Sequence, residues 1–126
     1  LLMPQITIDY SRGLESELNL PELGNILHRA VVATGRFPVG AIRTYVRGCD
    51  HSIVGDEAAG NGFINIQIRI GPGRSAELKT SLTKLFMEAV EVKLADHLAR
   101  RPFGVQLEIT ELDPAFTLSR NSMMPT

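Results

Sequence analysis

Alternation of apolar and polar residues in short stretches of the chain predicts four β-strands. The clearest stretch is 63–70, where isoleucine occupies every second position and Asn65, Gln67 and Arg69 point the other way. The remaining strands are predicted at residues 5–10, 41–48 and 105–110. Each stretch has one apolar and one polar face, so the sheet is expected to pack its core against one face only.

Apolar residues at helical spacing predict two helices. The first covers residues 19–34, with Asn19 as its N-cap, Pro21 in its first turn and Gly35 as its C-terminal stop. The second begins after a cap at Ser75 and ends near residue 98 or 100. Its inner stripe is predicted to consist of Leu78, Leu82, Leu85, Phe86, Ala89 and Val92.

The order strand–helix–strand occurs twice, which predicts an α+β protein made of tandem βαβ units of the α/β type. The strands within each unit should be parallel. One four-stranded sheet with two helices on one face would match apolar strand faces to apolar helix stripes. The predicted organisation is a single domain over residues 1–126, with halves at about 4–50 and 62–112, extra residues at 1–3 and a tail at 113–126 with a short strand around 116–118.

The second face of the predicted sheet is polar. Two explanations fit it equally well: the face contacts solvent, or it forms a subunit interface with hydrogen bonds and ion pairs. The residues that make up this face are Thr7, Arg43, Tyr45, Arg47, Asn65, Gln67, Arg69, Gln106 and Glu108.

Composition narrows the classes of function. A formal net charge of -1 argues against a general nucleic-acid or membrane-surface binder, which would usually be basic. Cys49 is the only cysteine, so no intrachain disulfide can form, and a reducing compartment such as the cytoplasm fits. The three histidines lack metal-ligand spacing, so no metal site is expected. No apolar run approaches the roughly 20 residues of a membrane span.

Four segments, taken together and in order, carry a resemblance to a known family. They are the start Met3-Pro4, the run ATGRFPVGAIR at 33–43, the strand–turn–helix junction IRIGPGRS at 68–75, and LEITELDP at 107–114. Each is a weak signal alone, but the set spans nearly the whole chain. The chain resembles the 5-carboxymethyl-2-hydroxymuconate isomerases of the tautomerase superfamily.

The resemblance implies a tautomerase-like sheet assembled as a homotrimer, with the polar sheet face turned to the interior. The implied activity is a proton shift in a 2-hydroxymuconate-type dienol, which yields a conjugated 2-oxo acid in the breakdown of aromatic acids. The implied partner is a small-molecule dicarboxylate substrate. No cofactor is implied.

The resemblance also implies that Pro4 is the catalytic base, as an amino-terminal residue freed by removal of Met3. Burial and nearby cations disfavour the protonated form of an amine, so its pKa would fall toward neutrality. A base with such a pKa can remove a proton and then return it, which contributes roughly 10²- to 10⁴-fold. From its position alone, Pro4 is better explained as the start of an edge strand, where proline is tolerated, and only the resemblance favours the catalytic role.

A polyanionic substrate needs cations, and the resemblance implies Arg43 as a catalytic residue and Arg74 as a substrate-binding residue. The guanidinium fork binds a carboxylate with two parallel hydrogen bonds. Arg43 lies on a polar strand face, and Arg74 lies at a helix start, where the backbone also favours anions. Without the resemblance, each would be read as an ordinary surface ion pair.

Four further residues complete the predicted substrate-binding set. Phe37 and Pro38 are expected to form an apolar wall near the amine, or equally a turn with phenylalanine in the core. Tyr45 stands where the family tends to carry a basic residue, which changes the expected shape of the substrate. Arg47 either supplies the missing charge one step along the same face or is unrelated to the site.

Two other functions compete with this isomerase. A related tautomerase would keep Pro4 but act on a different 2-oxo acid. A non-catalytic trimeric scaffold is the second, because Leu1 and Leu2 ahead of Met3 would make the nitrogen of Pro4 an amide that cannot accept a proton. The mass of the mature chain distinguishes the scaffold from the enzymes.

Overall fold

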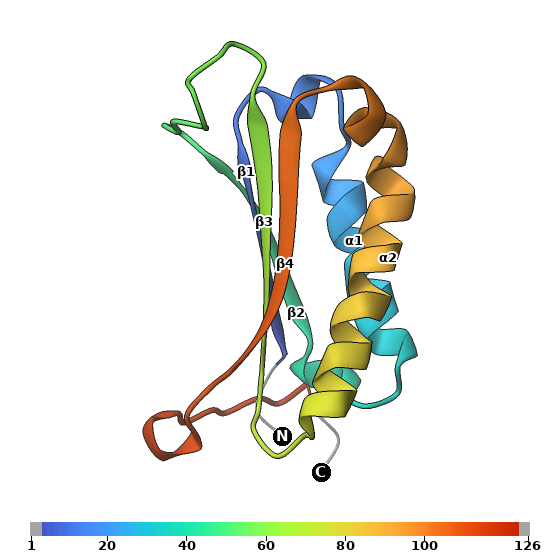
Figure 1. The fold of residues 1–126 in the computed structure, drawn as a ribbon. Helices are drawn as coiled ribbons and strands as arrows, with labels where there is room; N and C mark the ends of the chain where they lie inside the picture. Colours follow the sequence, from blue (N-terminus) through green and yellow to red (C-terminus); the bar gives the residue numbers. More distant parts are fainter. Residues whose placement is uncertain (1–3, 124–126) are drawn as a thin grey trace.

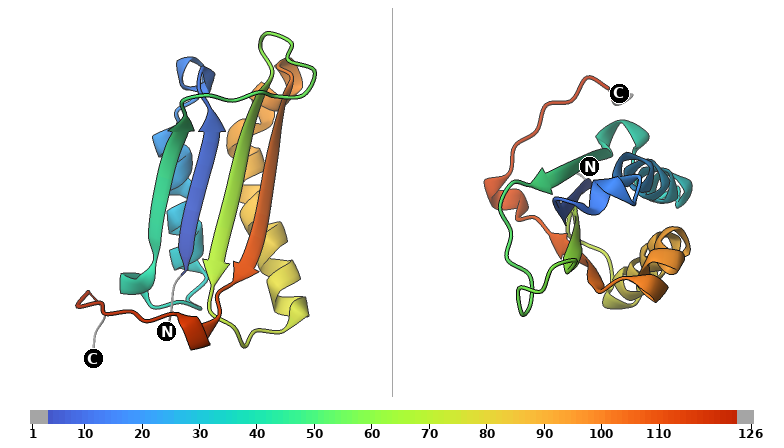
Figure 2. Two further views of the ribbon diagram at one scale, coloured as in Figure 1. Left: turned by 90° about the vertical axis from the view of Figure 1, so that its left-hand side faces the viewer. Right: turned by 90° about the horizontal axis from the view of Figure 1, so that it is seen from above.

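The computed structural model describes residues 4–123, in which one sheet is covered by two helices. Both helices pack on the same face of the sheet, and the opposite face is open (Figures 1 and 2). The extra residues predicted at 1–3 lie outside the described part of the chain. Within residues 4–123, neither helix is long and apolar enough to cross a membrane.

The sheet has the order β2-β1-β3-β4, with strands β1 Gln5–Ser11, β2 Arg43–Cys49, β3 Gly62–Ile70 and β4 Phe103–Glu111. β1 and β2 are parallel, and so are β3 and β4, which confirms the two predicted βαβ units. The two units meet through β1 and β3, which are antiparallel. The sheet is therefore mixed. The strands β1 and β2 begin at the end of the sheet where β3 and β4 terminate (Figure 2).

The two helices begin at the predicted caps. α1 spans Leu20–Ala33, and the side chain of Asn19 accepts a hydrogen bond from the backbone N–H of Glu22 at 3.0 Å. α2 spans Ala76–Arg100, and Ser75 accepts one from Leu78 at 3.1 Å. These side chains satisfy backbone donors that a helix start otherwise leaves unpaired.

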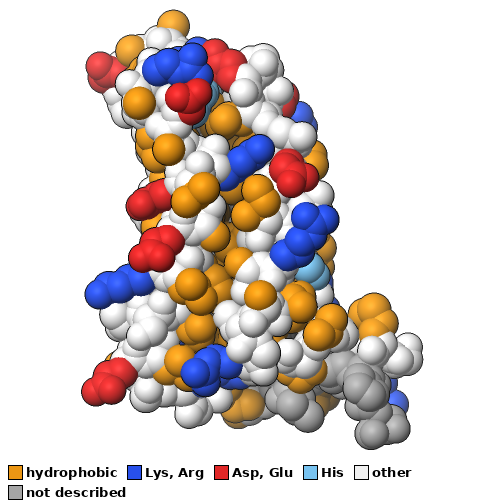
Figure 3. Space-filling view, turned by 90° about the vertical axis from the view of Figure 1, so that its right-hand side faces the viewer, with side chains coloured by type: hydrophobic (Ala, Val, Ile, Leu, Met, Phe, Trp, Pro, Cys, Tyr) orange, Lys and Arg blue, Asp and Glu red, His pale blue; other side chains and the backbone are white. Residues whose placement is uncertain are grey.

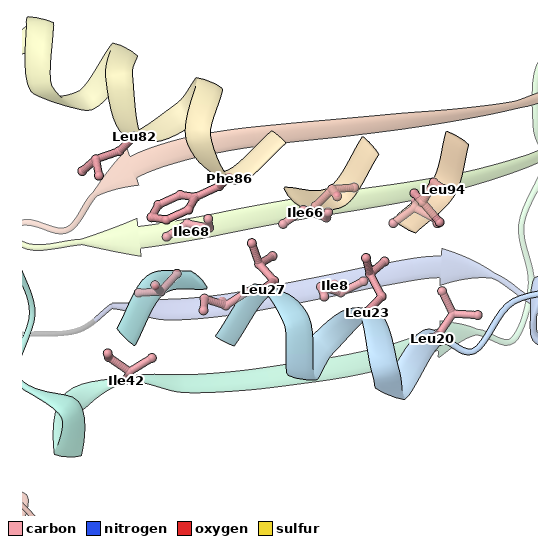
Figure 4. Close-up of a cluster of buried hydrophobic side chains, with 14 of the residues drawn as sticks. Ile8, Leu20, Leu23, Leu27, Ile42, Ile66, Ile68, Leu82, Phe86 and Leu94 are labelled. Atoms are coloured by element: carbon pink, nitrogen blue, oxygen red, sulfur yellow. The ribbon is translucent and has the colours of Figure 1, made fainter. Parts of the chain in front are cut away.

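The core lies between the helices and the apolar face of the sheet. Alternate residues of β1 and β3 point into it, and Ile6, Ile8, Ile66 and Ile68 are fully buried. On this one face, α1 contributes Leu20, Leu23 and Leu27 to the core, and α2 next to it contributes Phe86 (Figure 4). The period-2 and helical patterns of the sequence thus converge on one core, as predicted.

The inner stripe of α2 differs from the prediction. The buried positions advance by four residues, through Leu82, Phe86, Val90 and Leu94, whereas Leu85 and Val92 are 48% and 82% exposed. Each step of four residues turns about 40° around a helix of 3.6 residues per turn. The contact line therefore winds around α2 as the helix crosses a twisted sheet. Apolar side chains are left on the outer, helical face, with charged side chains to either side (Figure 3).

Two predicted strand segments are wrong. Residues Val39–Ala41 form a 3-10 turn after Pro38, so β2 begins at Arg43 rather than at Ala41. In the tail, Pro114–Phe116 form another 3-10 turn instead of opening a strand around 116–118. In that turn the side chain of Asp113 accepts a hydrogen bond from the backbone of Ala115 at 2.9 Å. Local hydrogen bonds therefore close both turns, from the backbone alone in the first and with the help of the Asp113 side chain in the second.

α1 packs directly on β2 because Gly24 carries no side chain. A Cβ at Gly24 would lie 2.6 Å from Cγ2 of Val46, a short branched side chain with little freedom to move. We expect Gly24→Ala to lower the free energy of unfolding by up to about 2 kcal/mol, because overpacking costs about 1–3 kcal/mol and the gain in helix propensity returns about 1 kcal/mol. Urea denaturation measures this change.

Gly104→Ala is the matched control, because nothing lies within 4 Å of the Cβ it would add. Its effect should stay within about ±0.5 kcal/mol. A Gly24→Ala chain as stable as the unchanged protein would contradict the close packing of α1 on β2.

Candidate active site

Pro4 and Arg43 lie side by side at the end of the sheet where β1 and β2 begin. The backbone N–H of Arg43 donates to the carbonyl of Pro4 at 3.3 Å, and the next residue of β1, Gln5, pairs in register with Arg43. Pro4 is buried, whereas the side chain of Arg43 is exposed. The proline is therefore buried, and the neighbouring strand carries an exposed guanidinium.

The side chain of Arg43 lies on the open face of the sheet. Its Nη2 donates to the side-chain oxygen of Gln5 at 3.3 Å. On the other side of Gln5, the register of the sheet pairs it with Arg69 of β3. Arg43, Gln5 and Arg69 thus form a row across three strands, one residue away from Pro4.

Arg74 lies in the turn between β3 and α2 and holds two loops together. Its Nη1 donates to the carbonyl of Gly71 at 3.2 Å, and its Nη2 donates to the carbonyl of Arg36 at 3.3 Å. The guanidinium also lies over the ring of Phe37, 4.5 Å from the ring centre. The turn needs Gly73, whose φ of +109° is unfavourable for residues with a side chain.

Phe37 and Pro38 belong to the segment that joins α1 to β2. Phe37 is only 6% exposed and packs in the core, while its ring supports the guanidinium of Arg74. Pro38 is half-buried and begins the 3-10 turn that ends just before Arg43. Phe37 is therefore a core residue whose ring also contacts a cation. Its part in an apolar wall beside Pro4 stays a prediction.

The structure separates Arg47 from the residues around Pro4. Arg47 is four residues beyond Arg43 on β2, about 13 Å along a strand. Both oxygens of Asp9 accept hydrogen bonds from it, at 3.0 and 3.3 Å. These bonds, and then the attraction between the charges, raise the pKa of Arg47 above its usual value. Arg47 is thus already paired with a carboxylate of its own chain.

Tyr45 lies between the two arginines on the same face, 43% exposed and in register with Thr7. It is two residues from Arg43, about 7 Å along the strand. Its hydroxyl-bearing ring is thus a neighbour of the row formed by Arg43, Gln5 and Arg69.

Sequence reasoning did not select Arg69 or Gln5 for the site. Both were visible as polar residues at alternating positions, and Arg69 was assigned to the polar face. What the sequence does not contain is the antiparallel register that sets Arg69 opposite Gln5. Once this register is known, three arginines are close to the end of the sheet that carries Pro4: Arg43, Arg69 and Arg74. Such an arrangement can bind a substrate with several carboxylates beside the buried Pro4.

Comparison with known proteins gives consistent relatives. A family model described as 5-carboxymethyl-2-hydroxymuconate isomerase matches residues 4–126. The 5-carboxymethyl-2-hydroxymuconate Delta-isomerase of Escherichia coli is 26% identical over 121 residues, which is 96% of each chain. A crystal structure of a 5-carboxymethyl-2-hydroxymuconate isomerase from Deinococcus radiodurans R1 matches with a TM-score of 0.90 and 28% identity, over 97% of this chain and 92% of that one.

A more distant structure, described as a fused 4-OT symmetric trimer, matches with a TM-score of 0.58. It is 20% identical, and the match covers 86% of this chain and 85% of that one. At this level of identity the likeness concerns the fold alone. The tautomerase-like four-stranded sheet with two helices on one face is thereby confirmed.

Proposed function

The chain belongs to the 5-carboxymethyl-2-hydroxymuconate isomerase family, a family of enzymes whose model spans residues 4–126, and on this premise we propose that it isomerises 5-carboxymethyl-2-hydroxymuconate. The observation that carries the proposal is the hydrogen bond between Arg43 and Pro4, which joins a buried proline to a strand that presents a guanidinium. An amine and a carboxylate-binding cation are what this proton transfer requires.

In the proposed mechanism, Pro4 acts as a free amino-terminal amine. The amine accepts the proton of the 2-hydroxyl group, and the resulting ammonium delivers a proton to the far carbon of the diene. The product is a 2-oxo acid whose remaining double bond is conjugated with the new carbonyl, and no electrons are gained or lost. One group serves as base and then as acid, so no cofactor enters the reaction.

Arg43 has two proposed roles in this reaction. Its fork binds the carboxylate next to the reacting oxygen, and it stabilises the negative charge that develops on that oxygen. Arg74 is the proposed ligand of a second carboxylate; three of its five donors remain after its two hydrogen bonds to carbonyls. Phe37 and Pro38 form the apolar wall, and Tyr45 borders the bound substrate. Arg47, paired with Asp9, is left out of the proposed set.

The decisive test is the activity of a chain that begins at Pro4. We expect it to convert 5-carboxymethyl-2-hydroxymuconate to its 2-oxo isomer, and the change in ultraviolet absorbance measures the rate of this conversion. A panel of other 2-hydroxy and 2-oxo dienoates separates this activity from that of a related tautomerase, which would prefer another member of the panel. Failure on every substrate would leave only the scaffold interpretation.

We further propose a homotrimer. The open face of the sheet is largely polar, and β2 and β4 are edge strands with unpaired backbone groups. In the tail, Phe116, Leu118 and Met123 are 88%, 100% and 75% exposed, and a second copy of the chain would cover such side chains. Sedimentation equilibrium should give the mass of three chains, and the mass of one chain would reject the assembly.

A further inference from the structure

Arg69 is a cation without a counter-charge in the described part of the chain. It is exposed on β3, and within residues 4–123 its side chain makes no hydrogen bond or ion pair. Its register neighbours are neutral, Gln5 on β1 and Thr110 on β4. A charge placed between two neutral residues is available to an external anion.

The acidic residues nearest to Arg69 in the sheet are engaged elsewhere. Glu108 accepts a hydrogen bond from Gln67 at 2.9 Å, and Glu111 pairs with Lys79 at 3.2 Å. By contrast Arg47, at the other end of the same face, is neutralised by Asp9. On this face the charge of Arg47 is therefore balanced by Asp9, whereas the charge of Arg69 has no counter-charge within residues 4–123.

The geometry sets Arg69 within reach of a ligand held by Arg43. Both residues pair with Gln5, one from each side, and two strand spacings of about 4.8 Å put their backbones about 10 Å apart. All three side chains extend from the open face, so two guanidinium groups flank one amide. A molecule lying over Gln5 can contact both forks.

The chemistry of the proposed substrate calls for such a third cation. A muconate is a diacid, and the carboxymethyl branch adds one more carboxylate, so the molecule carries three negative charges. Arg43 and Arg74 account for two of them. We infer that Arg69 binds the carboxylate of the carboxymethyl branch and thereby determines specificity for the branched triacid over the unbranched diacid, an inference that rests on the proposed function.

The test compares two substrates in chains that begin at Pro4. We expect Arg69→Gln to raise KM for 5-carboxymethyl-2-hydroxymuconate at least tenfold, with kcat within twofold. The same variant should leave KM for 2-hydroxymuconate, which lacks the branch, within twofold. Arg69→Lys, which keeps the charge but not the fork, should fall between the two. Arg29→Gln is the matched control, because it removes an exposed charge from the helical side of the sheet.

Each other outcome overturns the inference. Equal changes with both substrates would mean that Arg69 does not sense the branch, and no change with either would mean that it binds neither. A loss of subunit association in Arg69→Gln, seen by sedimentation, would make Arg69 an interface residue instead. An unchanged chain that converts neither substrate would reject the proposed function together with the inference, whereas an active chain with an indifferent Arg69 rejects the inference alone.

Discussion

A chain that retains Met3 ahead of Pro4 should have a kcat/KM about 10²- to 10⁴-fold lower than a chain that begins at Pro4. In the longer chain the nitrogen of Pro4 is part of a peptide bond, and an amide nitrogen does not accept a proton at neutral pH. The proposed mechanism assigns both proton transfers to this one atom, so no other group compensates. Intact mass defines each terminus, and initial rates with 5-carboxymethyl-2-hydroxymuconate give the ratio.

Folding has to be controlled separately, because Pro4 is buried and its carbonyl pairs with Arg43. The two chains should have the same circular dichroism and the same unfolding midpoint, which would assign the loss to the amine. Pro4→Ala in the shorter chain keeps a free amine but makes it primary, and its kcat/KM should still fall at least a hundredfold. Equal rates with free and blocked Pro4 would reject proline catalysis.

Arg43→Ala should lower kcat/KM at least a hundredfold, which corresponds to about 2.7 kcal/mol of transition-state stabilisation. The reason is the double role proposed for Arg43, which binds a carboxylate and stabilises the charge on the reacting oxygen. Because the second role acts mainly in the transition state, kcat should fall as well as kcat/KM. Arg43→Lys should recover part of the loss, since it restores the charge but not the fork.

Arg47→Ala is the control for the loss of a positive charge in Arg43→Ala. It removes the same charge from the same face of β2, but from a residue bound to Asp9 about 13 Å away along the strand. Its effect on kcat/KM should be much smaller than that of Arg43→Ala. If the two variants were equally impaired, the positive charge of the whole face, rather than the fork of Arg43, would govern substrate binding.

Much of the fold was predictable because its signals are local. Alternating isoleucines in β3 can satisfy only a strand with one buried face, and Asn19 and Ser75 mark helix starts through hydrogen bonds to residues three positions later. The inner stripe of α2 was only partly predictable. Leu85 and Val92 have the sequence spacing of an inward-facing helical stripe. They are nevertheless exposed, because the line of contact between α2 and the twisted sheet winds around the helix.

The candidate site, too, was predictable from the sequence only in part. The sequence shows the residue types of the site: a proline before a strand, an arginine on a polar strand face and an arginine at a helix start. The segments that contain them are among those that carry the family resemblance. The tertiary structure alone decided which of them meet. Asp9 and Arg47, 38 positions apart, form an ion pair, and the antiparallel pairing of β1 with β3 sets Arg69 beside Gln5. Periodicity along a strand depends only on neighbouring residues, whereas register between distant strands depends on backbone hydrogen bonds and packing across the whole sheet.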